Sequence, residues 1–272
     1  MSNDTNASLP SNARPGWALV TGASGGIGAA IARELAALGY DVALNARNGD
    51  ALAALAAELE RDHPIRTRVL AADLGAPGAA DALADALIAE GIAPTVLVNN
   101  AGFGVFGLYR DTDGAREQAM IDLNISALSR LSKRLLPGML TIGRGRILNV
   151  ASTAAFQPGP YMAVYYATKA YVLSYSEALA EELSGTGVSV TALCPGPTAS
   201  SFQDQAAMHD SALVKGKRMP SAADVAAYGV RAMQRGQRVA IHGVQNWVLA
   251  QSVRFTPRRV TTWLVAKLSR PV

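Results

Sequence analysis

Short apolar runs alternate along the chain with longer alanine- and leucine-rich segments, and this alternation constrains the fold more than any other feature. The runs, at residues 17–21, 41–46, 67–71, 95–99, 146–150, 188–193 and 238–242, have the length of β-strands. The segments between them, at 26–38, 51–61, 79–90, 116–136, 162–183 and 222–234, have helical period and suit right-handed crossovers. We therefore predict an α/β, doubly wound fold with a seven-stranded parallel sheet.

Length and composition are consistent with one such domain over residues 15–243, because a chain of 272 residues, half of them hydrophobic, can bury a large core. Residues 1–14 are rich in Asn, Ser and Pro, and we predict a disordered tail there. Residues 244–272 follow the last predicted strand, and we predict a C-terminal helical extension.

The single cysteine, Cys194, excludes an internal disulfide, and we expect it to be a small buried residue rather than a nucleophile. Residues 1–14 hold no apolar stretch of the kind a signal peptide needs, and no run of about 18 uninterrupted apolar residues could form a spanning helix. We therefore expect a cytoplasmic protein. The three histidines lie far apart without neighbours at ligand spacing, so we expect no metal.

A glycine-rich turn, Thr-Gly-Ala-Ser-Gly-Gly-Ile-Gly at residues 21–28, follows the first predicted strand and opens a helix. Glycine lets the chain turn tightly and approach a pyrophosphate closely, while the helix N-terminus offers unpaired N–H groups and the positive end of a dipole. Such a turn on its own can also be a plain tight turn. Its position after the first strand favours an anion site.

This turn resembles the glycine motif of the short-chain dehydrogenase/reductase family, and further matches follow in the family's order over about residues 16–243. Asp73 follows the third strand, the Asn-Asn-Ala-Gly run at 99–102 follows the fourth, and Pro195-Gly196 follows the sixth, although each alone is also an ordinary turn sequence. The resemblance implies a Rossmann fold that binds a dinucleotide, with Asp73 at the adenine and Thr198 at the nicotinamide carboxamide. The implied cofactor-binding residues are Gly22, Ser24, Gly25, Gly26, Ile27, Gly28, Arg47, Asp73, Leu74, Asn100, Ala101, Gly102, Tyr165, Lys169, Pro195, Gly196 and Thr198.

Tyr165 and Lys169 stand four residues apart in a predicted helix, so their side chains share one helix face. A nearby ammonium stabilises a phenolate, which lets the phenol exchange protons nearer neutrality, but such a pair is more often an exposed helix pair. Ser152 stands thirteen residues before Tyr165, the spacing of the family's catalytic serine, and Asn124 falls where the family has its fourth member. The resemblance therefore implies that Asn124, Ser152, Tyr165 and Lys169 are catalytic.

The activity that the resemblance implies is hydride transfer between a nicotinamide cofactor and a carbonyl or secondary alcohol. Ser152 would hydrogen-bond the carbonyl and Tyr165 would protonate the alkoxide. Lys169 would lower the pKa of Tyr165 and hold the ribose, while Asn124 would hold a water on the proton path. Tyr166 points about 100° away from Tyr165, and we expect it to pack or to line the pocket. A dinucleotide-binding protein without chemistry is the alternative, and turnover separates the two.

The end of the second predicted strand bears on the choice of cofactor. Residues 42–47 carry no carboxylate and end in Arg47, whereas an NAD-preferring enzyme usually has an Asp or Glu there to bind the ribose. A guanidinium can pair with the 2′-phosphate of NADP(H), or it can be a solvated loop group. Gly25 stands where some NADP-binding relatives have a second basic residue, so we predict a real but incomplete preference for NADP(H).

The sequence says less about the substrate and the partners. We expect an apolar ketone, aldehyde or acyl-chain carbonyl, with residues 197–219 as a mobile cover. Its pocket would be lined by Phe103, Val105, Phe106, Phe156, Gln157 and Pro158, although each phenylalanine can equally belong to the core. No nucleic-acid-binding motif is recognisable, and we expect no nucleic-acid partner.

The C-terminal end is strongly basic: eight lysines and arginines and no acidic residue follow Asp224, in a chain of net charge +4. Within residues 244–272, Val260, Trp263, Leu264 and Leu268 recur at helical spacing. Many family members end in a short tail after the seventh strand, so the extension puts the common tetramer in doubt. We expect a homo-oligomer, a dimer rather than a tetramer, with the extension as dimer contact or pocket wall. Shallow peripheral attachment to an anionic membrane is the alternative.

Overall fold

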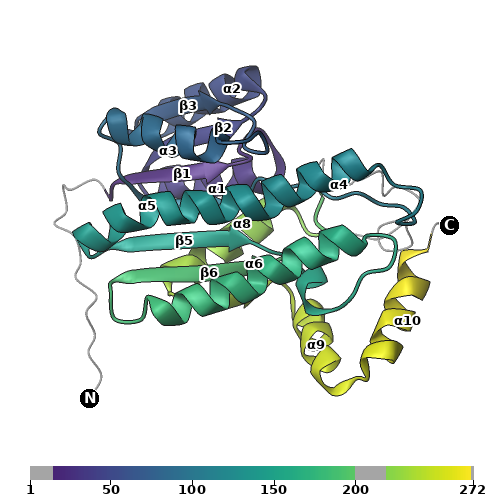
Figure 1. Cartoon of the computed structure of the whole chain (residues 1–272). Helices are drawn as coiled ribbons and strands as arrows, with labels where there is room; N and C mark the ends of the chain where they lie inside the picture. The colour runs from purple at the N-terminus through teal and green to yellow at the C-terminus, as the bar shows by residue number, and fades with distance from the viewer. Residues whose placement is uncertain (1–14, 200–218, 271–272) are drawn as a thin grey trace, which may run out of the picture.

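Figure 1 shows the computed structural model, which describes residues 15–199 and 219–270. The predicted tail at 1–14 and most of the predicted cover at 197–219 lie outside these ranges. Strands and crossover helices alternate as predicted: β1 (Trp17–Thr21), α1 (Gly26–Ala37), β2 (Asp41–Ala46), α2 (Gly49–Asp62), β3 (Thr67–Ala71), α3 (Ala79–Ala89), β4 (Pro94–Asn99), β5 (Gly145–Val150), α6 (Ala163–Glu182), β6 (Val188–Cys194), α8 (Ala222–Gln234) and β7 (Val239–Ile241).

The strands form one parallel sheet in the order β3-β2-β1-β4-β5-β6-β7, which confirms the predicted seven-stranded, doubly wound fold. The chain leaves β1 toward β2 on one side and returns to β4 on the other. The loops after β1 and β4 therefore diverge, and open α/β sheets bind ligands in the crevice at such a switch point.

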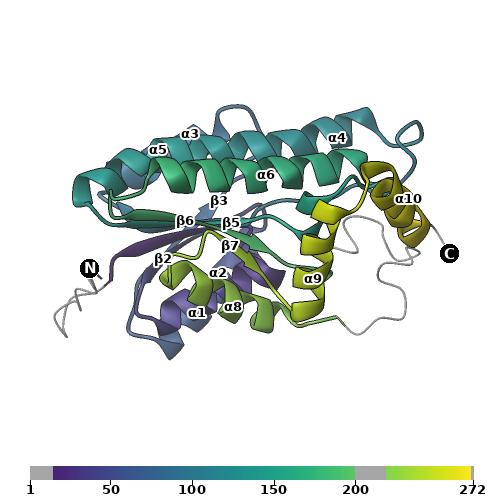
Figure 2. The same ribbon diagram turned by 90° about the horizontal axis from the view of Figure 1, so that it is seen from below.

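Helices cover both faces of the sheet, with α1, α2 and α8 on one side and α3, α5 (Leu128–Ile142) and α6 on the other (Figure 2). Side chains of β1 alternate between the two layers: Ala18 and Val20 join the core with α1 and α8, while Leu19 joins the core with α3 and α5. Burial on both faces explains why the strands are continuous apolar runs in the sequence.

A series of buried, hydrogen-bonded polar side chains links β4 and β5 to the helices α5 and α6. The amide of Asn99 donates to Ser132 at 3.0 Å and to Oδ1 of Asn149 at 2.8 Å, and Asn149 donates to Ser176 at 2.9 Å. Buried amides need such partners, because an unpaired one costs about 1–3 kcal/mol. The network holds in place the two strand ends that carry Asn100 and Ser152.

The segment predicted as one helix at 116–136 is in fact interrupted. It consists of α4 (Gly114–Ile121), a π-helical turn η1 (Asp122–Ala127) and α5 (Leu128–Ile142). A π-helical turn shifts the side chains that follow it on the helix and is common at functional sites. Here it lies at Asn124.

The predicted helical extension is present. It comprises α9 (Val244–Ser252), a 3-10 turn η3 (Val253–Phe255) and α10 (Arg258–Ser269). The two helices form a hairpin beyond the carboxyl ends of β5 and β6, at the right of Figure 1. The extension therefore lies at the end of the sheet where ligands bind in this class of fold.

Candidate active site

A cavity of about 860 Å³ lies at the carboxyl ends of the strands. Its walls come from the loops after β1 to β6, from the first turns of α6, and from α9 and α10. Every residue predicted to bind the cofactor lines it except Gly28, and so do Ser152, Tyr165 and Lys169. Residues that are distant in the sequence thus come together in one place.

The glycine turn leaves room for an anion at the start of α1. Gly22 and Gly26 adopt positive φ angles of 66° and 54°, which favour glycine. The first turn of α1 has no side-chain cap, and a Cβ added at Gly25 would have nothing within 4 Å. Unpaired N–H groups and open space at a helix N-terminus suit a pyrophosphate.

Gly28 has a role in packing that was not predicted. A Cβ there would lie 2.2 Å from the Gly22 carbonyl oxygen and 2.4 Å from the Asn100 amide nitrogen. Glycine at this position therefore allows α1 to pack tightly against the turn, and it does not line the cavity. Direct contact of Gly28 with a cofactor stays a prediction, because the spacing of a glycine motif does not show which glycine faces the ligand.

Hydrogen bonds tie the glycine turn to the loop after β4. The Thr21 hydroxyl donates to the Val98 carbonyl at 3.1 Å and accepts from the backbone N–H groups of Asn100 and Ala101, both at 3.0 Å. The Asn100 amide donates to the carbonyls of Thr21 and Gly22 at 2.9 and 3.2 Å. The two loops of the switch point thus form one rigid wall, and Thr21 is a residue whose role the sequence did not reveal.

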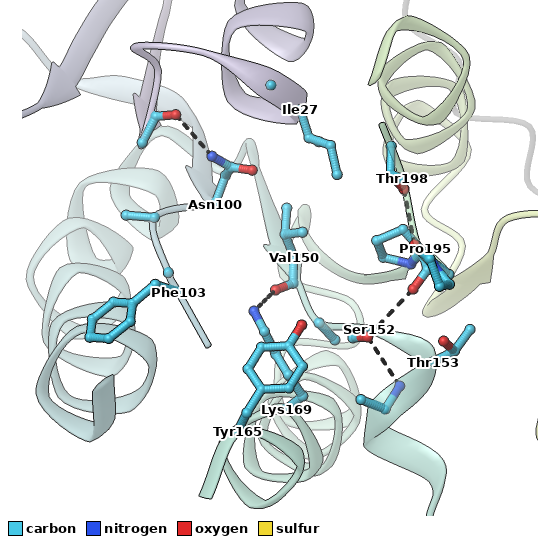
Figure 3. Close-up of a pocket in the computed structure, with 18 of the residues that line it drawn as sticks. Ile27, Asn100, Phe103, Val150, Ser152, Thr153, Tyr165, Lys169, Pro195 and Thr198 are labelled. Carbon is cyan, nitrogen blue, oxygen red and sulfur yellow. Dashed lines mark hydrogen bonds between the residues drawn. The ribbon is translucent and has the colours of Figure 1, made fainter. Parts of the chain in front are cut away.

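The predicted proton-transfer group lies on the opposite wall (Figure 3). Tyr165 and Lys169 come from the same face of α6 and are only 8% and 6% exposed. The Lys169 Nζ donates to the Val150 carbonyl at 2.8 Å and lies 5.8 Å from the centroid of the Tyr165 ring. The Ser152 Oγ accepts from the Ala154 N–H at 3.0 Å.

Burial dominates the acid–base properties of this pair. It raises the pKa of Tyr165 above the ordinary value, and a hydrogen bond with Ser152 opposes the rise. Burial also lowers the pKa of Lys169 to about 8. Burial of the phenol therefore favours its neutral, protonated form in this structure. The expectation that Lys169 lowers the pKa of Tyr165 stays a prediction.

Asn124 supports the site from behind and does not line the cavity. It is 2% exposed, its Oδ1 accepts from the Phe103 N–H at 3.1 Å, and its amide donates to the Phe103 carbonyl and to Thr168 Oγ1, both at 3.0 Å. Both amide hydrogens are therefore in use. The side chain joins the π-helical turn to the loop after β4 and to α6, so any water-holding role would fall to the backbone.

The remaining predicted cofactor residues lie along the rim. Arg47 lines the cavity at the end of β2 and is exposed. Asp73 closes its own turn by accepting from the Gly75 N–H at 3.0 Å. Thr198 is buried and donates to the Gly196 carbonyl at 2.9 Å. The loops after β2, β3 and β6 thus complete a continuous groove from Arg47 to Tyr165.

The part of the cavity beyond the catalytic group differs from the prediction. Phe103 and Gln157 line it, whereas Phe106 and Phe156 pack against apolar clusters behind its wall. Tyr166 lines it as expected, and so do Met219 from the end of the predicted cover and Leu268 from the apolar pattern of the extension. The lining also includes apolar residues that the sequence did not single out: Met162, Leu249, Ala250 and Val265. The extension therefore supplies a pocket wall, which was one of the three expectations for it.

On α10 the face that packs inward is not the one the apolar spacing suggested. Thr261 and Ser269 are buried and Val265 packs against the cluster around Tyr166, whereas Trp263 is 60% exposed. A Thr-Val-Ser face is too polar to be recognised as buried from sequence alone. The apolar residues that formed the visible pattern mostly point away from the protein.

Comparison with known proteins identifies the family, since the short chain dehydrogenase profile matches residues 16–210. The chain belongs to the short chain dehydrogenase family. In structure it resembles a short-chain dehydrogenase from Sphingobium yanoikuyae in complex with NADPH, with a TM-score of 0.79 and 31% identity over 88% of this chain and 94% of that one. It also resembles a bulky-bulky ketone specific alcohol dehydrogenase from Comamonas testosteroni, with a TM-score of 0.76 and 27% identity over 89% and 93% of the two chains.

In sequence, this short chain dehydrogenase is 36% identical over 176 residues to a very-long-chain 3-oxoacyl-CoA reductase from Coprinopsis cinerea. The match covers 64% of this chain and 52% of that protein. The chain thus spans about half the length of the curated relatives of this kind. The oxidoreductase family that the motifs implied is confirmed.

Several expectations for this short chain dehydrogenase stay predictions, among them the dimer, the cytoplasmic location and the absence of nucleic-acid and metal partners. Over residues 15–199 and 219–270, no three His, Cys, Asp or Glu side chains are grouped to hold a metal ion. No helix in the same ranges has the length and hydropathy to cross a bilayer. Cys194 is buried, and burial raises the pKa of its thiol to about 12, which agrees with an inert residue.

Proposed function

We propose that this chain is an NADP(H)-dependent reductase of apolar carbonyl compounds. One observation carries the proposal: Ser152, Tyr165 and Lys169 line the same cavity as the glycine turn and Arg47. A proton donor, an alkoxide-stabilising hydroxyl and a dinucleotide groove are the parts that such a reaction needs.

The groove suits a dinucleotide in four places. The uncapped start of α1 beside Gly25 suits the pyrophosphate. Asp73 and Thr198, to which the resemblance assigns the adenine and the nicotinamide carboxamide, both line the groove. Arg47 is placed to pair with a 2′-phosphate through charge-assisted bonds worth roughly 1.5–3 kcal/mol, or about tenfold to a hundredfold in affinity. The NADPH bound in the Sphingobium yanoikuyae neighbour supports the same cofactor.

The reaction uses the side chains of the opposite wall. When bound, the dinucleotide supplies the hydride that reduces the carbonyl carbon. The Ser152 hydroxyl, whose bond to the Pro195 carbonyl is long at 3.5 Å, can turn its proton toward the carbonyl oxygen. Tyr165 keeps its proton at neutral pH because burial raises its pKa, and gives it up as the alkoxide forms. The Lys169 ammonium then stabilises the tyrosinate and holds the ribose hydroxyls.

The substrate class follows from the apolar part of the cavity. Phe103 and Met162 line this part, and Leu249, Val265 and Leu268 of the extension complete its wall. Such a surface binds a long or bulky apolar group better than a sugar. The 3-oxoacyl-CoA reductases and the bulky-ketone dehydrogenase among the similar proteins support this choice.

The test is NADPH oxidation by the purified protein with a bulky aryl ketone, a long-chain 3-oxoacyl thioester and a ketose. We expect turnover with the first two, little with the third, and a higher Michaelis constant for NADH than for NADPH. Tight NADPH binding without turnover on any carbonyl would instead favour the dinucleotide-binding alternative. Light scattering on the same sample tests the proposed dimer.

A further inference from the structure

The extension carries an unusual set of exposed apolar side chains. We define its outer face as Val244, Trp247, Val248, Phe255, Val260, Trp263 and Leu264, which are 43–88% exposed. Phe255, at 88%, ends the turn η3 that joins α9 to α10. This turn is the tip of the hairpin in Figure 1. Exposed patches of this kind mark surfaces that contact a partner, because water solvates large apolar side chains poorly.

Cations accompany these apolar side chains. Arg254, Arg258, Arg259 and Lys267 are all exposed, and the Lys267 Nζ lies 5.6 Å from the centroid of the Trp263 ring. Over the described ranges, 15–199 and 219–270, none of these four takes part in a salt bridge. The extension itself has no acidic residue to neutralise them. Its outer face is therefore apolar and positive at once.

We propose that this outer face docks the protein onto an anionic lipid surface. Aromatic side chains beside Arg and Lys are the composition of helices that lie in the membrane interface. Each cation near such a surface contributes about fivefold in affinity, and the apolar side chains add burial among the acyl chains. The hairpin tip at Phe255 and the exposed side of α10 at Trp263 would enter the headgroup region.

The charge distribution favours lipid over a second copy of the chain. In a two-fold dimer built on this face, the same patch would meet itself, so Arg254, Arg258 and Arg259 would approach their own counterparts. Like charges brought together without carboxylates oppose association. An anionic bilayer supplies the opposite charge that the chain lacks here.

The cavity opens toward the same region. Leu249 and Leu268 line the cavity and are also 57% and 52% exposed. A docked protein would present these two leucines to the acyl chains, and an apolar carbonyl could pass from the lipid into the cavity. This consequence rests on the proposed function, whereas docking itself does not.

The experiment is co-sedimentation of the full chain with vesicles of phosphatidylcholine alone or with 30% phosphatidylserine. We expect binding to the anionic vesicles, weak binding to the neutral ones, and release as NaCl rises from about 0.1 to 0.5 M. Arg254→Gln/Arg258→Gln/Arg259→Gln should weaken binding on the order of a hundredfold. Trp247→Ser/Phe255→Ser/Trp263→Ser should abolish sedimentation at any salt.

A matched control removes three apolar side chains of similar exposure at the other end of the molecule. Ile88→Ser/Leu140→Ser/Ile142→Ser alters side chains that are 40–53% exposed, and it should bind like the wild type. Equal circular dichroism melting curves show that each variant is folded. The proposal is overturned if the wild type stays in the supernatant, if it binds both vesicles equally, or if the outer-face variant binds normally. It is also overturned if that variant converts a dimer into a monomer without a change in vesicle binding.

Discussion

The sheet domain and the C-terminal extension differ in whether their surface cations are paired with carboxylates. On the surface of the sheet domain, arginines pair with carboxylates: Arg33 bonds Glu58 and Arg68 bonds Glu90, each at 2.6 Å. In the extension, no described acidic partner lies within reach of the cations. Paired surface charges keep a protein soluble and add little to its stability. A run of unpaired cations, in contrast, attracts a negatively charged partner.

The two regions also differ in how they bury apolar residues. β2 and β4 are buried along their whole length, whereas α9 buries only Ala250, and α10 only Thr261 and Ser269. Yet both regions line one cavity. The comparison indicates a division of tasks in the proposed function: the carboxyl ends of the strands would bind the cofactor and move the proton, while the extension would shape the substrate end of the cavity and face outward.

The largest effect expected on the sheet side is that of Tyr165→Phe. Loss of the transferable proton should lower kcat by about 10²–10⁴-fold, with the dissociation constant for NADPH unchanged because Lys169 still holds the ribose. Steady-state kinetics and fluorescence titration measure the two. Tyr166→Phe, on the neighbouring residue, is the matched control and should be mild. A dead Tyr166→Phe beside an active Tyr165→Phe would reverse the assignment.

The next effect is on stability. The pKa of Lys169 is about 8 in the folded chain and 10.5 in the unfolded one, so the unfolded chain binds more protons between these values. The penalty for burying the ammonium is therefore fully present below pH 8 and vanishes as the pH rises to 10.5. Lys169→Met should raise the free energy of unfolding at pH 7 by about 2–3 kcal/mol while abolishing turnover.

Urea unfolding at pH 7, 8 and 9.5 checks this point, because the gain from Lys169→Met should shrink as the pH rises. Lys133→Met is the control for loss of an exposed lysine and should show no such trend. A gain that is constant with pH would mean that the lysine side chain is not desolvated.

A smaller effect is expected at the cofactor rim. Arg47→Ala should raise the Michaelis constant for NADPH about tenfold or more and leave that for NADH nearly unchanged, because only the 2′-phosphate loses its partner. Initial rates with both cofactors show the difference. Equal weakening of both would show that Arg47 contacts a group common to the two dinucleotides.

The smallest expected effect distinguishes the role of the extension from that of the carboxyl ends of the strands. Deleting residues 257–272 removes α10 and uncovers Tyr166, and it should raise the Michaelis constant of an apolar ketone several-fold without changing that of NADPH. A cut after Gly243 is less selective, because Asn246 packs against Gly196 in the cofactor groove. An unchanged ketone constant would show that α10 is no part of the substrate wall.

Sequence reasoning reached the sheet and the cofactor groove because their determinants are local. Apolar runs define buried parallel strands, and Gly25 or Tyr165 can be recognised from spacing to a neighbour in the chain. Sequence reasoning did not predict the contacts of side chains whose neighbours come from distant segments of the chain. The hydrogen bonds of Asn124 to Phe103 and Thr168 and the burial of Lys169 arise only when loops and helices meet in space.

The extension shows the same limit of sequence reasoning, because its helix was predicted but its buried face was not. Its apolar spacing at Val260 and Leu264 correctly indicated a helix, but a one-sided pattern does not say whether that side faces the protein or a partner. The inward face at Thr261 is polar enough to be taken for solvent-exposed. Its burial depends on the cluster around Tyr166, which no local pattern encodes.

One measurement tests the central claim most directly: kcat/KM with NADPH for a series of methyl ketones of increasing chain length. An apolar wall built from the sheet edge and the extension predicts a rise of about fourfold per added CH₂ until the cavity is filled, since each buried methylene is worth about 0.8 kcal/mol. The chain without residues 257–272 should show a flatter rise. No NADPH oxidation with any member, or rates independent of chain length, would contradict the account.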